Sequence, residues 1–163
     1  MPGRGATGTS CSSDAPPRRS RVGPCRRVLT RRAGASVKVS FFDAITIGRV
    51  GDPDTTDDGA IRAPSLLDLA GTKVKALLQR VEAKDYRDVV ALLDHGVALT
   101  DILGAARALF GPSFNPLLAQ KALTYFEGGD LSALGEDVRN RLIADATRDL
   151  HVVPLALRST RLD

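Results

Sequence analysis

The sequence predicts an α+β protein in which a short β element precedes a bundle of about five helices. Two stretches rich in β-forming residues come first, 37–42 and 45–50, and residues 37–41 alternate between apolar and polar. From Ser65 to about Leu150 the apolar residues recur instead at the spacing of amphipathic helices. The change of period near residue 65 therefore marks the passage from strands to helices.

The strands are few. The segments 37–42 and 45–50 are separated by Asp43 and Ala44, so we expect them to pair through a short turn. Residues 51–59 have the composition of a loop, and 61–63 can add a third short strand that ends before Pro64. Two or three strands do not make an independent sheet with its own core, which favours a missing partner upstream.

Helix boundaries follow from capping chemistry. Ser65 can cap a first helix, Thr100 a third, and Asn115 followed by Pro116 a fourth. The five expected helices span approximately residues 65–80, 83–93, 100–111, 115–125 and 135–150.

The first 35 residues differ from the rest in composition. They hold eight arginines and one acid, Asp14, a net charge of +7, whereas residues 36–163 carry 15 bases and 18 acids, a net charge of −3. Their longest apolar run is two residues, so we predict a disordered basic tail over 1–35 and a folded domain over 36–163. An unstructured leader, an organelle transit peptide and a nucleic-acid-binding arm all suit this composition.

Composition also excludes several classes of protein. No stretch approaches 18 consecutive apolar residues, so no membrane-spanning helix is expected. Two cysteines without histidine or acidic companions make neither a disulfide scaffold nor a zinc site. We expect a cytoplasmic protein that does not bind a membrane.

One polar group in the helical region needs a partner. Lys73 lies on the apolar face of the first expected helix, and Asp85 and Asp88 share one stripe of the second. If the two helices form an antiparallel hairpin, that stripe can face Lys73. A structural ion pair between helices and a catalytic pair both explain this pattern, and spacing alone favours the structural ion pair.

The same two segments carry a family resemblance. Residues 65–80, SLLDLAGTKVKALLQR, and 84–93, KDYRDVVALL, resemble the AbiEii/AbiGii-type nucleotidyltransferase toxins of bacterial abortive-infection and toxin–antitoxin systems. The family pattern is a D-L-A-x-x-K helix, an A-L-x-x-R end and an R-D-x-x-D helix. This sequence has Lys84 where many members have arginine, and it keeps Arg87 and Asp88. The resemblance covers roughly residues 37–150.

The resemblance implies a function and a set of site residues. Such enzymes resemble polymerase-β-like nucleotidyltransferases, which move a nucleoside monophosphate from a nucleoside triphosphate (NTP) to an acceptor, in some members the tRNA 3′ end. By the resemblance, Lys73 and Arg80 bind the nucleotide and Asp88 supports catalysis, with Asp85 and Arg87 in support. Mg²⁺ and NTP are the cofactors expected for intact relatives, and an antitoxin protein is the expected partner.

The sequence departs from the family where the metal should bind. The family places a Gly-Ser or Gly-Gly turn and an Asp-x-Asp or Asp-x-Glu strand before the strand at Val37, and the basic tail contains neither. Asp52-Pro53-Asp54 lies in a loop and Gly128-Gly129-Asp130 in a turn, so neither supplies the metal carboxylates. We therefore expect a truncated family member, inactive alone and without a metal site. The alternative is a non-catalytic helical module that binds a partner or RNA.

Overall fold

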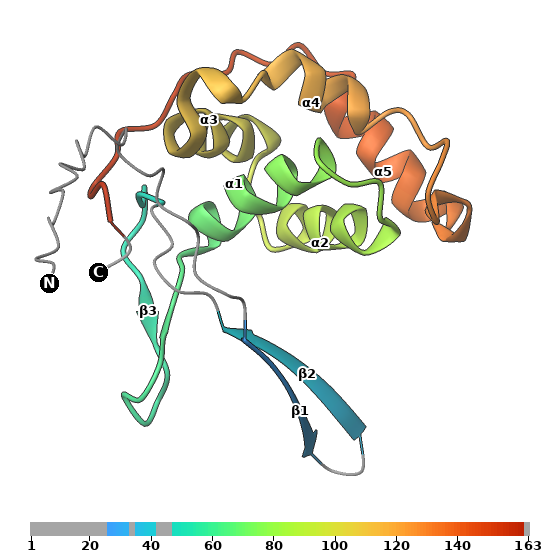
Figure 1. Cartoon of the computed structure of the whole chain (residues 1–163). Helices are drawn as coiled ribbons and strands as arrows, with labels where there is room; N and C mark the ends of the chain where they lie inside the picture. Colours follow the sequence, from blue (N-terminus) through green and yellow to red (C-terminus); the bar gives the residue numbers. More distant parts are fainter. Residues whose placement is uncertain (1–25, 33–34, 42–46, 162–163) are drawn as a thin grey trace, which may run out of the picture. The chain divides into compact units, whose positions relative to one another are not determined.

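The computed structural model describes residues 26–32, 35–41 and 47–161, and it forms two compact units, Met1–Ile45 and Thr46–Asp163. The predicted α+β class with a helical bundle is confirmed, because short strands precede five α-helices along the described chain (Figure 1). In order, the elements are β1 (Arg26–Arg32), β2 (Ala35–Phe41), β3 (Asp54–Thr55), β4 (Arg62–Ala63), α1 (Leu66–Leu77), α2 (Ala83–Asp94), α3 (Leu99–Phe110), α4 (Pro116–Ala122) and α5 (Glu136–Ala146), with single 3₁₀ turns at Gly111–Ser113 and Leu131–Ala133.

The first unit contains an antiparallel ribbon of β1 and β2, in register from Arg26 opposite Phe41 to Arg32 opposite Ala35. The predicted pairing of 37–42 with 45–50 is wrong, because β2 pairs with the strand before it in the sequence. The β1 strand also lies inside the segment 1–35 assigned to a disordered tail, of which residues 1–25 lie outside the described part. No apolar alternation marks β1: four of its seven residues are arginine, and Leu29 is 76% exposed.

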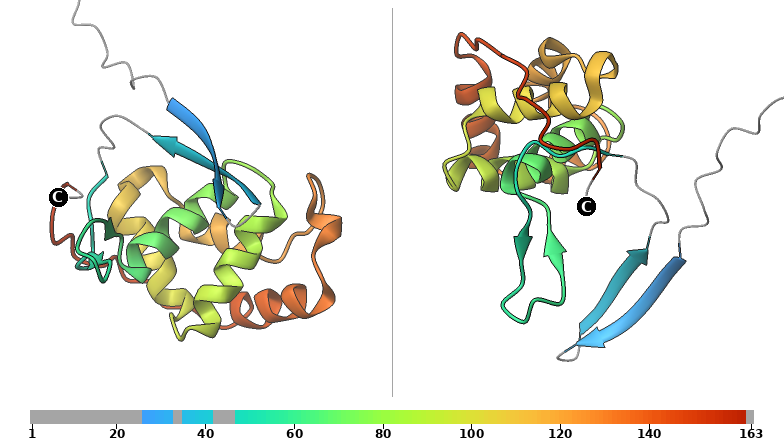
Figure 2. Two further views of the ribbon diagram at one scale, coloured as in Figure 1. Left: turned by 90° about the horizontal axis from the view of Figure 1, so that it is seen from below. Right: turned by 90° about the vertical axis from the view of Figure 1, so that its left-hand side faces the viewer.

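The second unit begins with the β3–β4 hairpin. Its four paired residues are Asp54 with Ala63 and Thr55 with Arg62, so part of the predicted strand 61–63 is present and its partner comes from the predicted loop. The expected strand 45–50 is replaced, over its described residues, by extended chain in which Arg49 makes an isolated antiparallel bridge to Ser159. The hairpin extends away from the helices of this unit (Figure 2).

The helix starts follow the capping chemistry in two of three cases. The side chain of Ser65 accepts the backbone N–H of Asp68, and that of Asn115 accepts the N–H groups of Leu117 and Leu118. The predicted cap at Thr100 is wrong, since α3 begins at Leu99 after Ala98 and has no side-chain cap. The last helix ends at Ala146 rather than near Leu150.

The core lies where α1 crosses α3. Gly71 of α1 makes this close approach feasible, because a Cβ atom there would lie 3.0 Å from the backbone nitrogen of Ala106. Fully buried apolar side chains come from the helices and from the stretches between them: Val74 of α1, Val89 of α2, Ile102 and Leu103 of α3, Leu142 of α5, and Phe114, Leu123 and Leu131 between helices. Burial of this apolar surface is the main stabilising term for the unit.

The C-terminal segment runs from α5 back along α3 to the start of the unit (Figures 1 and 2). The N–H of Leu155 donates to the carbonyl of Gly104 at 3.4 Å, and the chain then pairs with Arg49. Gly104 leaves room for it, since a Cβ atom there would lie 2.5 Å from the Val153 carbonyl oxygen.

Candidate functional site

The position of α1 is fixed at its first turn by Asp68, a buried residue with 3% exposure. One carboxylate oxygen accepts the Val50 N–H at 2.7 Å, and the other accepts the Gly51 N–H at 3.2 Å and the Ser65 hydroxyl at 2.6 Å. A negative charge at a helix N-terminus is also favoured by the helix dipole. Asp68 thus ties the helix to the chain that enters it.

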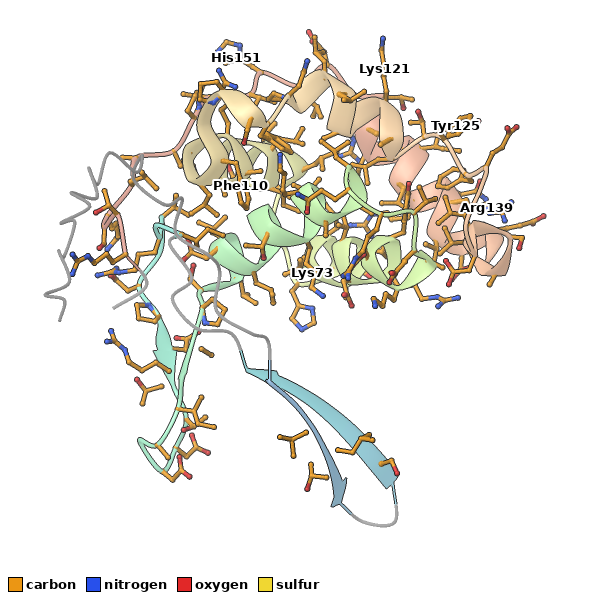
Figure 3. All side chains as sticks on the ribbon, viewed as in Figure 1. Lys73, Phe110, Lys121, Tyr125, Arg139 and His151 are labelled. Atoms are coloured by element: carbon orange, nitrogen blue, oxygen red, sulfur yellow. The ribbon has the colours of Figure 1, made fainter. Side chains whose placement is uncertain are left out.

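Lys73 lies between the first and second turns beyond that anchor and meets α2 across the hairpin (Figure 3). Its ammonium donates to Asp88 Oδ2 at 2.5 Å, with 29% of the Lys73 side chain and 43% of the Asp88 side chain exposed. The sequence-based prediction that the stripe of Asp85 and Asp88 faces Lys73 is therefore confirmed for Asp88, whereas Asp85 pairs with Arg80. Both partners remain accessible to solvent, and so to a ligand.

A pocket of about 320 Å³ opens beside this pair. Lys73 and Asp88 supply its charged groups, and leucines from both helices supply an apolar wall. Its lining residues are Leu66, Leu69, Lys73, Asp88, Ala91, Leu92 and His95. Such a combination of an apolar wall with a few polar groups is typical of small-molecule sites.

Arg80 and Asp85 form a second ion pair nearer the α1–α2 connection. Arg80 Nε donates to one Asp85 oxygen at 2.8 Å and Nη2 to the other at 3.1 Å. The Asp85 side chain is fully buried, and its hydrogen bonds raise the pKa of the Arg80 guanidinium above its usual value. Neither Arg80 nor Asp85 lines the pocket beside Lys73.

Arg87 does not line the pocket either. Its Nη2 donates to the Ala133 carbonyl at 2.7 Å, which joins α2 to the 3₁₀ turn at Leu131–Ala133. Of the five predicted site residues, the structure therefore brings Lys73 and Asp88 together at the pocket. Asp85, Arg80 and Arg87 serve contacts that position α2.

His95 is a pocket residue that the sequence analysis did not select. It follows Asp88 by seven positions, with Ala91 and Leu92 between them, so all four share one stripe of α2. The ring Nδ1 lies 2.8 Å from the Ala91 carbonyl oxygen. Extending the Asp88 stripe by two turns would have identified it.

Comparison of the sequence with protein-family models identifies a family. The family model described as nucleotidyl transferase AbiEii toxin, type IV TA system, matches residues 26–152. The chain belongs to the AbiEii nucleotidyl transferase toxin family. The match includes both helices of the pocket and also β1, which the sequence analysis had placed in the tail. Neither the curated proteins nor the solved structures gave a match.

Family membership makes an antitoxin a plausible partner and makes NTP and a divalent metal the usual cofactors. The described residues do not fit a metal ion, because no three His, Cys, Asp or Glu side chains among them gather into a metal-binding group. Asp88 and Asp85 are each engaged by a cation instead.

No single helix in the described part of this AbiEii-family chain is long and apolar enough to cross a membrane. The pair formed by α2 and the stretch Leu99–Ser113 reaches the required length and composition jointly, but it is bent by 119°.

Proposed function

We propose that the α1–α2 hairpin is the nucleotide-binding part of an AbiEii-type nucleotidyltransferase, with Lys73 as the contact to the NTP phosphates. The observation that carries this proposal is the partly exposed Lys73–Asp88 pair at the edge of an open pocket. A cation at such a position offsets the negative charge of phosphates.

The exposure of the pair supports a ligand-binding role. An ion pair that is about one third exposed is worth little net stability, so a phosphate can compete with Asp88 for Lys73 at small cost. Asp88 then orients the lysine before the ligand arrives. In this proposal, Arg80 and Asp85 support the hairpin rather than the nucleotide.

Nucleotidyl transfer itself needs carboxylates that hold a metal, and the described residues do not gather them. We propose that residues 47–161 bind nucleotide without completing the transfer. In this proposal, tRNA is the acceptor that intact relatives use, an antitoxin protein is the partner of this chain, and the chain is located in the cytoplasm.

The test compares Lys73→Met with Lys75→Met on the same helix. Lys75 is a matched control because its ammonium donates to the Ser113 carbonyl at 2.7 Å and lies over the Phe110 ring, away from the pocket. We expect isothermal titration calorimetry to show NTP binding in the wild type and in Lys75→Met, and at least about tenfold weaker binding in Lys73→Met.

Two results would contradict the proposal. One is a wild-type chain that binds no NTP, and the other is a Lys73→Met variant that binds NTP as tightly as the wild type. In either case Lys73 and Asp88 form a structural ion pair. A labelled-nucleotide transfer assay with tRNA tests the expected inactivity separately, since incorporation by the chain alone would refute it.

A second candidate function is the helical binding module. The observation in its favour is an exposed apolar group on and after α4, where Leu117, Leu118 and Tyr125 are 68%, 55% and 59% exposed. Size-exclusion chromatography with the purified antitoxin would test it, with Leu117→Ser/Leu118→Ser expected to abolish co-elution. Co-elution that survives this double substitution would count against the module.

A further inference from the structure

His95 is placed to contact whatever occupies the pocket. It lies at the C-terminal end of α2, two turns beyond Asp88, and lines the pocket together with Lys73 and the leucine wall. Asp88 and His95 thus lie along one stripe that ends at the C-cap of α2, and Lys73 reaches Asp88 from α1. A ligand held at Lys73 extends along that stripe toward His95.

The hydrogen bond to Ala91 fixes which atom His95 offers. A carbonyl oxygen only accepts, so the Nδ1 atom at 2.8 Å from it carries the proton and donates. In the neutral ring the other nitrogen, Nε2, is then an acceptor. Because Nδ1 is occupied by the helix backbone, Nε2 is the polar atom that His95 has available for a ligand.

The wall beside His95 suits a flat apolar ring. Leu66 and Leu69 come from α1 and Leu92 from α2, and Leu66 is 47% exposed. A volume of about 320 Å³ lies at the lower end of the range for small-molecule pockets, roughly 300–1,000 Å³. A single nucleobase fits this size better than a peptide or a nucleic-acid strand.

We propose that His95 determines base specificity: its Nε2 accepts a hydrogen bond from the exocyclic amino group of a nucleobase lying against the wall of Leu66, Leu69 and Leu92. This inference rests on the proposed nucleotide function of Lys73. Cytosine carries an amino group where uracil carries a carbonyl, so CTP is preferred over UTP. A carbonyl oxygen opposite an acceptor nitrogen leaves both atoms without a hydrogen bond.

The experiment measures binding of CTP, UTP and inorganic tripolyphosphate to the full chain by isothermal titration calorimetry. We expect CTP to bind about three- to tenfold more tightly than UTP, the range of one net hydrogen bond. His95→Phe keeps a ring but removes the acceptor, so the CTP-to-UTP ratio falls to about one while tripolyphosphate binding is unchanged. His151→Phe, at an exposed histidine outside the pocket, keeps the wild-type ratio.

The outcomes separate this inference from the function on which it rests. Equal binding of CTP and UTP by the wild type, or a ratio unchanged in His95→Phe, overturns the role of His95 while tripolyphosphate binding at Lys73 stands. A His95-dependent preference for CTP without any tripolyphosphate binding supports His95 and removes the phosphate role of Lys73. A chain that binds none of the three ligands overturns both.

Discussion

Asp68→Asn tests whether the anchor of α1 is held by a carboxylate. The two oxygens of Asp68 accept three hydrogen bonds, from the Val50 and Gly51 N–H groups and from the Ser65 hydroxyl. Asparagine keeps one of the two oxygens and replaces the other with an amide NH₂. If the remaining oxygen serves Val50, the NH₂ group faces the Gly51 N–H, and two donors oppose each other.

The expected change in the free energy of unfolding follows from the hydrogen bonds and the charge that Asp68→Asn removes. A hydrogen bond to a charged acceptor is worth about 1.5–3 kcal/mol, against about 0.5–1.5 kcal/mol for a neutral one. Removing the negative charge also costs about 0.3–1 kcal/mol at a helix N-terminus. Asp68 is only 3% exposed, so water compensates little. We expect the free energy of unfolding to fall by about 2–3 kcal/mol, a drop in Tm of roughly 8–12 °C.

Thermal and urea unfolding followed by far-UV circular dichroism measure the effect, with the exposed Asp57→Asn as the matched control. Amide hydrogen exchange gives the local measure, since the Val50 and Gly51 amides should exchange faster in Asp68→Asn. An unfolding midpoint equal to that of the control, with unchanged exchange at these two amides, would refute the reasoning.

Three further predictions concern other contacts. Gly104→Ala should speed proteolytic cleavage within the C-terminal segment, because its Cβ would lie 2.5 Å from the Val153 carbonyl oxygen; an unchanged cleavage rate would argue against this packing. Arg80→Met should lower the unfolding midpoint by leaving the buried Asp85 carboxylate unpaired, and adding Asp85→Leu should restore part of it; a double variant less stable than Arg80→Met would contradict this. Burial raises the pKa of the Tyr86 phenol above 10.0, so the folded chain keeps a proton that the unfolded chain releases. Stability should therefore fall as pH rises through 10 toward the folded-state pKa, and Tyr86→Phe should flatten this loss; a wild-type curve as flat as the variant's would disprove it.

Local chemistry explains why the helical part could be predicted. Ser65 and Asn115 cap the helices they precede because the interaction needs only residues two or three positions away. The contact between Lys73 and Asp88 follows from two amphipathic helices joined by a short connection, which must lie antiparallel. These features depend on few residues, all close in sequence.

The strands could not be predicted in the same way. β1 has no apolar alternation that would mark it as the partner of β2, although the two pair in register from Arg26 opposite Phe41 to Arg32 opposite Ala35. The bridge from Arg49 to Ser159 joins residues more than a hundred positions apart, and no pattern in the C-terminal segment marks it. Within the site, the sequence showed three cations and two acids and predicted that the acids face Lys73, but it did not show that Asp85 pairs with Arg80. Arg80 pairs with Asp85, the acid that is fully buried. Which of the two acids is buried depends on how the helices of the hairpin pack, and the sequence pattern does not show this.

The two ion pairs of the α1–α2 hairpin differ in a way that matters for loading the pocket. In the Arg80–Asp85 pair the acid is fully buried, whereas in the Lys73–Asp88 pair both side chains are partly exposed to water. A ligand that replaces Asp88 as the partner of Lys73 leaves the Arg80–Asp85 pair intact. The two helices of the hairpin therefore need not separate when the ligand binds. Nucleotide binding should then shift the NMR signals of a few pocket side chains and leave the backbone signals of the hairpin largely unchanged.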